Sequence, residues 1–118
     1  MAYPVVHFEV TGKDIGKLKS FYGDVFEWEF QDFAEPGMPA YAIVEKAEGG
    51  IAGGIGENPD GPGHVTFYVA VPDPQATLDK AVSKGATVVM PVTELPMVTL
   101  ALFNDPEGQM VGIVKDAS

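Results

Sequence analysis

The sequence of 118 residues predicts a single α+β domain built from two tandem βαβββ modules. Three observations support this fold class. Short runs alternate apolar and polar residues as half-buried strands do, two amphipathic segments each follow a good helix N-cap, and the order of these elements repeats. The modules cover about residues 1–57 and 62–118. We expect them to form a curled mixed sheet around a cavity, with the helices on its outer face.

The first module begins with the strand VVHFEV, in which the apolar residues share one face while His7 and Glu9 share the other. A helix follows in DIGKLKSFYGDVF, with Asp14 as its N-cap. Its apolar face is expected to contain Ile15, Leu18, Phe21, Tyr22 and Val25. Three strands complete the module: WEFQDF, PAYAIVEK and the glycine-rich GGIAGGIG, with a turn at residues 34–39 between the first two.

The turn-rich segment ENPDGPG separates the modules. The next strand, HVTFYVAV, turns His64, Thr66 and Tyr68 to one face. The second helix lies in DPQATLDKAVSKG, where Asp73 is the N-cap and Gly85 ends the helix. Its predicted apolar face consists of Leu78, Ala81 and Val82. The remaining strands are ATVVMPV, MVTLALF and QMVGIV.

Two landmarks suggest how the modules align. His64 lies 57 residues after His7, and Gly112 lies 58 residues after Gly54. Two modules of nearly sixty residues are the simplest explanation for these spacings. The alignment predicts that His7 and His64 occupy equivalent strands and face one cavity.

Composition limits the partners and the cellular location. Seven basic and seventeen acidic residues give a net charge of −10, which disfavours binding to nucleic acids and to anionic membranes. The chain has no cysteine, no leader-like start and no apolar run as long as the roughly 18 residues of a membrane helix. These features indicate a cytoplasmic protein. Several potential edge strands favour a homodimer.

The polar faces of the strands contain the candidate site. We predict that His7, Glu9 and His64 are catalytic, because a His near a Glu can exchange protons near neutral pH. The predicted ligand-binding residues line the same cavity, with open space over the two glycines: Tyr41, Gly54, Thr66, Tyr68, Met110 and Gly112. A structural reading stays open, in which these side chains fill the core or hydrogen-bond to their neighbours.

Several motifs together resemble the vicinal oxygen chelate superfamily, which includes glyoxalase I, extradiol dioxygenases and bleomycin-resistance proteins. They are His7 ahead of SFYGDVFEWEF, the segment GHVTFYVAVPD, the segment KGATVV, and DPEGQ, which is similar to the superfamily's DPxGN turn. The resemblance covers essentially the whole chain. It indicates the fold more specifically than the chemistry, because the superfamily carries out several reactions.

The resemblance also implies an incomplete metal site. In metal-using members each module supplies one ligand from its first strand and another, usually Glu, from its fourth. His7 and His64 match the first pair, whereas Gly54 and Gly112 stand at the positions of the carboxylates. Glu9 and Glu45 are the carboxylates that could substitute for them. We expect no metal and no other cofactor, as in metal-free branches related to glyoxalase, which the ending VGIVK resembles.

Three classes of function follow, with a purely structural or interaction module as a fourth. The first is a protein that binds a small, partly apolar molecule in the cavity between the modules. The second is a metal-independent lyase, isomerase or epimerase that uses His7, Glu9 or His64 for proton transfer. The third is a metal-dependent enzyme similar to glyoxalase or to a dioxygenase. The sequence slightly favours the first class and leaves the ligand open.

Overall fold

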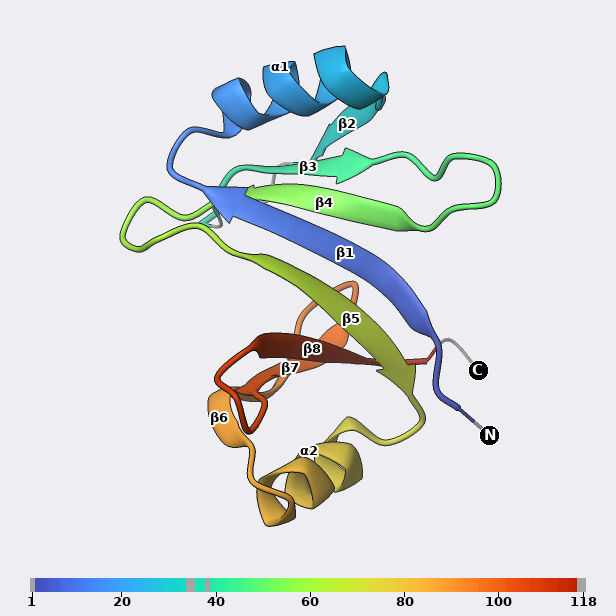
Figure 1. Ribbon diagram of the computed structural model, residues 1–118, viewed down its shortest axis with the longest axis vertical. Coiled ribbons are helices and arrows are strands. Elements are labelled where there is room, and N and C mark those ends of the chain that lie inside the picture. The colour runs from blue at the N-terminus through green and yellow to red at the C-terminus, as the bar shows by residue number, and fades with distance from the viewer. Residues whose placement is uncertain (1, 34–35, 38, 117–118) are drawn as a thin grey trace. The chain divides into compact units, whose positions relative to one another are not determined.

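The computed structural model describes residues 2–33, 36–37 and 39–116, and it has the predicted α+β fold (Figure 1). Of the predicted turn at 34–39, residues 34, 35 and 38 lie outside the described residues. All ten predicted elements are present, in the predicted order. They are β1 (Val5–Gly12), α1 (Ile15–Phe26), β2 (Phe30–Phe33), β3 (Tyr41–Val44), β4 (Ala52–Glu57), β5 (Val65–Val71), α2 (Pro74–Ser83), β6 (Thr87–Glu94), β7 (Thr99–Asn104) and β8 (Met110–Lys115).

The chain forms two compact units. One consists of residues 7–65, and the other combines residues 66–118 with the first six residues of the chain. The first two residues of β1, Val5 and Val6, therefore belong to the second unit. Val65, the first residue of β5, belongs to the unit of residues 7–65.

In the unit of residues 7–65 the strands follow the order β2-β3-β4-β1. β1 and β4 are parallel, so that Phe8 pairs with Gly53 and Glu9 with Gly54, whereas β2–β3 and β3–β4 are antiparallel. Helix α1 packs near β4 (Figure 1). As predicted, Asp14 caps this helix, because its side chain accepts a hydrogen bond from the backbone N–H of Lys17.

The unit of residues 66–118 repeats this plan with the order β5-β8-β7-β6. β5 and β8 are parallel, with Tyr68 opposite Gly112, and the other two pairings are antiparallel. Asp73 caps α2 through the backbone N–H of Ala76, and Gly85 follows the helix with a left-handed φ of 110°. The apolar core lies where α2 meets the sheet and contains Val71, Leu78, Ala101 and Ile113.

The predicted apolar faces of the helices are partly wrong. Phe21 and Val25 are 56% and 53% exposed, and Val82 on α2 is 46% exposed. In α1, the less exposed side is formed by Ile15, Leu18, Lys19, Tyr22 and Gly23. These positions follow the i, i+3, i+4, i+7, i+8 spacing of one helix face. The less exposed face of α1 is therefore narrower than the predicted apolar face, which also included Phe21 and Val25.

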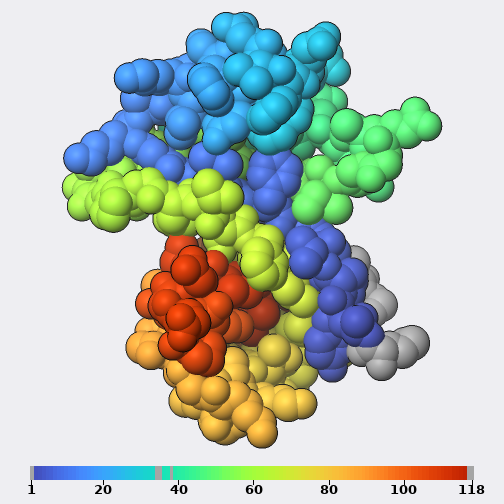
Figure 2. Space-filling model, in the orientation of Figure 1, coloured from blue at the N-terminus to red at the C-terminus, as the bar shows by residue number. Residues whose placement is uncertain are grey.

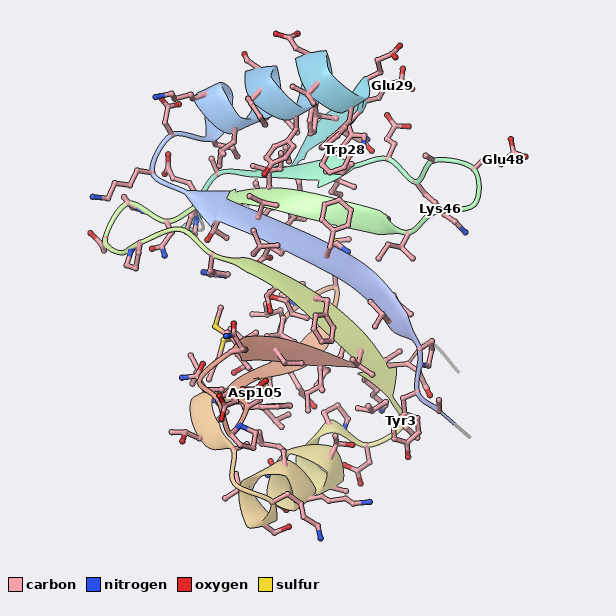
Figure 3. All side chains as sticks on the ribbon, in the orientation of Figure 1. Tyr3, Trp28, Glu29, Lys46, Glu48 and Asp105 are labelled. Carbon is pink, nitrogen blue, oxygen red and sulfur yellow. The ribbon has the colours of Figure 1, made fainter. Side chains whose placement is uncertain are left out.

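Aromatic side chains gather at the C-terminal end of α1. Trp28 stacks on Tyr22 with ring centroids 5.2 Å apart and an interplanar angle of 14°, and it also contacts Phe8 of β1 (Figure 3). These contacts connect the helix to the strand that carries the candidate catalytic residues. The connection between β3 and β4 projects from this unit (Figure 2), and its Lys46 and Glu48 point outward (Figure 3).

The strand registers correct the proposed alignment of the modules. Glu9 stands opposite Gly54 in one parallel pair of strands, and Tyr68 stands opposite Gly112 in the other. If Gly54 corresponds to Gly112 in the repeat, Glu9 therefore corresponds to Tyr68. The two N-caps, Asp14 and Asp73, are likewise 59 residues apart rather than 57. The residue that corresponds to His7 is therefore Thr66, and His64 lies two residues before it.

No helix among the described residues is long and apolar enough to cross a membrane.

Candidate functional site

Strand β1 presents three polar side chains on one face: His7, Glu9 and Thr11. All three are partly buried, whereas Val10 on the opposite face is 8% exposed. The alternation of a strand therefore places an imidazole, a carboxylate and a hydroxyl in a row. Thr11 continues the pattern of His7 and Glu9, so the sequence contained the signal for it, although we did not predict it as a site residue.

Tyr41, from β3, connects His7 to Glu9. Its hydroxyl donates to Glu9 Oε2 at 3.2 Å and lies 3.1 Å from His7 Nε2. Because the single hydroxyl proton is directed at the carboxylate, the tyrosine oxygen accepts from His7, which places a proton on His7 Nε2. Tyr41 was predicted as a ligand-binding residue, and in the structure it is part of the polar network itself.

His64 approaches the same carboxylate from the segment before β5. Its Nε2 lies 3.7 Å from Glu9 Oε1, which is too long for a hydrogen bond. This buried nitrogen makes no hydrogen bond with any residue that the structure describes. The other ring nitrogen, Nδ1, lies 3.0 Å from Thr11 Oγ1. The structure thus brings His7, Glu9 and His64 together in the unit of residues 7–65, although the two histidines are not equivalent in the repeat.

Burial controls the charge of His7. It lowers the pKa of the imidazole below the ordinary value of 6.5, and the nearby Glu9 carboxylate opposes this shift less strongly. His7 is therefore neutral at neutral pH and can accept a proton. The Glu9 side chain is 18% exposed and that of His64 is 30% exposed, so the cluster is shielded from solvent but not sealed.

The lowered pKa of His7 predicts a pH dependence of stability. Below pH 6.5 the unfolded chain protonates His7 while the folded chain does not, so this residue makes the free energy of unfolding fall as the pH drops from 6.5 toward the lowered pKa. His7→Gln should reduce that fall. Urea denaturation of both proteins at several pH values between about 7.5 and 5 measures it. Equal pH slopes for the wild type and the variant would contradict the prediction.

The predicted open space over the glycines is not present. A Cβ on Gly54 would lie 1.7 Å from the Tyr41 hydroxyl oxygen, and a Cβ on Gly112 would lie 2.2 Å from the Tyr68 ring. The absent side chains make room for tyrosine rings rather than for a ligand. Tyr68 is only 6% exposed, and Thr66 donates to the backbone carbonyl of Met110 at 2.5 Å. Tyr68, Thr66, Met110 and Gly112 all lie in the unit of residues 66–118.

The arrangement of side chains does not fit a metal ion. Among the described residues, no three His, Asp or Glu side chains are grouped in a way that could hold one. The Tyr41 hydroxyl occupies the position between His7 and Glu9, and Glu45 is exposed beyond the end of β3. The fourth-strand positions hold Gly54 and Gly112, each covered by a ring.

A surface groove of about 370 Å³ lies elsewhere in the unit of residues 66–118. It is lined by residues 95–99 together with Lys115 and Asp116, and it contains none of the predicted site residues. The polar cluster around β1, in contrast, brings a carboxylate, two imidazoles and two hydroxyl groups together within the described residues. Such a cluster can bind a polar atom and can exchange protons with it.

Comparisons with known proteins give a consistent result. The family model described as Glyoxalase/Bleomycin resistance protein/Dioxygenase superfamily matches residues 5–113. The protein named "Putative glyoxylase CFP32" from Mycobacterium bovis, and its counterpart from Mycobacterium tuberculosis, are each 29% identical over 106 residues. The match covers 85% of this chain and 41% of those proteins, so the chain spans less than half of their length.

Solved structures share the fold at low sequence identity. A variant of methylmalonyl-CoA epimerase from Streptomyces coelicolor, in complex with 2-nitronate-propionyl-CoA, has a TM-score of 0.71 at 14% identity and is covered in full, as is this chain. A hypothetical protein from Bacillus halodurans has a TM-score of 0.75 at 12% identity, over 100% of this chain and 97% of that one. Methylmalonyl-CoA epimerase from Mycobacterium tuberculosis has a TM-score of 0.71 at 12% identity, over 97% and 88%.

Proposed function

This chain belongs to the Glyoxalase/Bleomycin resistance protein/Dioxygenase superfamily, and from that premise we propose that it is a metal-independent proton-transfer enzyme. In this proposal it binds a small, partly apolar carbonyl compound beside His7, Glu9 and His64. The cluster removes a proton from the carbon next to the carbonyl group and returns one to it. The observation that carries the proposal is the single carboxylate, Glu9, flanked by Tyr41 and two imidazoles.

The chemistry of these groups supports such a role. A general base for carbon acids must accept a proton near neutral pH and must pass it on. Glu9 can take the proton. Tyr41 connects its carboxylate to His7, which is neutral because burial lowers its pKa. His64 Nε2 stands 3.7 Å from the other carboxylate oxygen. Hydrogen bonds therefore connect His7, Tyr41 and Glu9 for the exchange of protons, and His64 stands beside the carboxylate.

The structural neighbours supply a candidate substrate class. One structure of methylmalonyl-CoA epimerase is a complex with methylmalonyl-CoA and NH4⁺, and a variant of the Streptomyces coelicolor enzyme is in complex with 2-nitronate-propionyl-CoA. An epimerase inverts a carbon centre, which can be achieved by removing a proton and replacing it on the other side. At 10–16% identity these neighbours share the fold alone, so the transfer of this substrate class to the present chain is part of our proposal.

Binding without catalysis is the second candidate. One observation favours it: the Tyr41 hydroxyl already bonds to both His7 and Glu9, as in a network that only holds a structure together. A binding protein of this kind would retain the ligand but would leave its C–H bonds intact.

Hydrogen exchange at carbon separates the two candidates. We expect the wild type to introduce deuterium from D2O into methylmalonyl-CoA next to the thioester carbonyl, as detected by mass spectrometry. Glu9→Gln should lower this rate by about 10²–10⁴-fold, because a general base contributes that much. Glu94→Gln is the matched control, since Glu94 is an exposed residue at the end of β6, and its rate should equal that of the wild type.

Each outcome has a clear meaning. Saturable binding without exchange would favour the binding protein, and exchange that survives Glu9→Gln would remove Glu9 from the mechanism. If neither binding nor exchange occurred, methylmalonyl-CoA would be excluded as the substrate.

The homodimer and the cytoplasmic location also stay predictions. Phe21, Val25 and Phe26 each leave more than half of their surface exposed on α1, which is apolar area that a second copy of the chain can cover. We expect sedimentation equilibrium to give twice the mass of 12.5 kDa. A monomer at micromolar concentration would contradict this. The acidic composition still disfavours nucleic acid as a partner.

A further inference from the structure

We infer that Thr11 is a positioning residue for His64, whose hydroxyl holds the imidazole so that Nε2 carries a proton and points at Glu9. The inference deepens the proposed function and rests on it only for its effect on catalysis. The placement of the ring and its proton follow from contacts within the unit of residues 7–65.

Three hydrogen bonds connect Thr11 to His64. The backbone N–H of Thr11 donates to the His64 carbonyl at 2.9 Å, and the backbone N–H of His64 donates to Thr11 Oγ1 at 3.2 Å. The third joins Thr11 Oγ1 to His64 Nδ1 at 3.0 Å. Backbone and ring are thus held by one residue, and Nδ1 is the ring atom turned toward it.

The segment that carries His64 has little freedom to move away. A Cβ on Gly63 would lie 2.2 Å from the backbone carbonyl oxygen of Thr11, so the chain at this point passes very close to β1. Only glycine allows such an approach. The position of the His64 backbone is therefore set by β1, and the Thr11 hydroxyl sets the direction of its ring.

The contacts of its two ring nitrogens determine the tautomer of His64. Thr11 Oγ1 accepts from the backbone N–H of His64, and its one proton remains available for Nδ1. Nε2 faces the carboxylate oxygen of Glu9 at 3.7 Å, where a lone pair would be repelled by the negative charge. Neutral His64 therefore accepts from Thr11 at Nδ1 and has its proton on Nε2. The hydrogen bond at one ring nitrogen selects the proton position at the other.

This arrangement supplies Glu9 with a second proton donor. Tyr41 donates to Oε2, and His64 presents an N–H toward Oε1. Without the Thr11 hydroxyl, neutral His64 can adopt the other tautomer or turn its ring, and the donor beside Oε1 is lost.

The tautomer can be read directly by NMR of the whole protein labelled with ¹⁵N-histidine. With only two histidines in the chain, His64→Gln assigns the signals. At a pH where the ring is neutral, we expect wild-type His64 to show a protonated Nε2 and an unprotonated Nδ1. Thr11→Val, which keeps the shape of the side chain, should give a mixture of tautomers, and Thr11→Ser should restore the wild-type pattern. Thr93→Val is the matched control, because the Thr93 hydroxyl donates to the nearby Pro91 carbonyl, two residues earlier in the chain.

Two results would overturn the inference: a proton on Nδ1 in the wild type, or an unchanged tautomer in Thr11→Val. Because these measurements need no substrate, they stand even if the proposed enzyme activity fails. If the activity holds, Thr11→Val should lower the kcat of deuterium exchange by about tenfold or more with little change in KM, and Thr11→Ser should recover it. A tautomer that shifts in Thr11→Val while exchange remains at the wild-type rate would show that His64 is positioned as inferred but does not take part in catalysis.

Discussion

Replacing Gly112 by alanine is expected to destabilise the protein by roughly 1–3 kcal/mol, the usual cost of forcing an extra methyl group into a packed core. The new Cβ would lie 2.2 Å and 2.3 Å from two atoms of the Tyr68 ring and 2.9 Å from Cγ, where the ring joins the side chain. Tyr68 is 6% exposed and stands opposite Gly112 in the parallel pair of β5 and β8. Because even the base of the ring is in the way, a small rotation cannot relieve the clash.

Urea denaturation of Gly112→Ala measures this effect, and Gly50→Ala is the control. Gly50 is exposed, and a Cβ there would come no closer than 3.5 Å to the Ala47 carbonyl oxygen. Combining Gly112→Ala with Tyr68→Ala tests the cause. The double variant should lose less stability than the sum of the losses in the two single variants, because Tyr68→Ala removes the ring that the new Cβ strikes. If Gly112→Ala were as stable as Gly50→Ala, the close approach of the tyrosine ring would be wrong.

Gly54→Ala is expected to disable the candidate site. Its Cβ would lie 1.7 Å from the hydroxyl oxygen of Tyr41 and 2.1 Å from Cζ, so the hydroxyl has to leave its place between His7 and Glu9. A Cβ on Gly56 would also come within 3.2 Å of the same ring. Two glycines of β4 thus form the slot that holds Tyr41. Gly54→Ala should therefore lower deuterium exchange at least as much as Tyr41→Phe does, by about 10²-fold on the scale of general acid–base catalysis.

The comparison with Tyr41→Phe identifies the cause. Tyr41→Phe removes the hydroxyl while the ring keeps its place, so the fold should remain stable although both hydrogen bonds are lost. Gly54→Ala should lose activity and some stability together. Full exchange activity in Gly54→Ala, with Tyr41→Phe inactive, would mean that the ring has another position from which it can still bridge His7 and Glu9.

Much of the fold could be predicted because its signals are local. Alternation of apolar and polar residues located β1 and β5, and turn signals bounded the other strands. Asp14 and Asp73 marked both helix starts through hydrogen bonds to residues three positions away. The same alternation placed His7 and Glu9 on one face of β1. These features depend only on residues that are close together in the chain, so they can be predicted from the sequence.

The sequence by itself therefore determined the α+β class, the repeat of two βαβββ units and the polar face of β1. Only the tertiary structure decided what surrounds that face. It showed that Thr66 rather than His64 corresponds to His7, that Tyr41 fills the space over Gly54, and that Thr11 bonds to His64. Pairing register and the filling of space by large side chains depend on contacts between residues 13 to 53 positions apart, as between Tyr41 and Gly54 or between Thr11 and His64. Periodicity along one strand says nothing about such contacts, because they form only when the strands pack together.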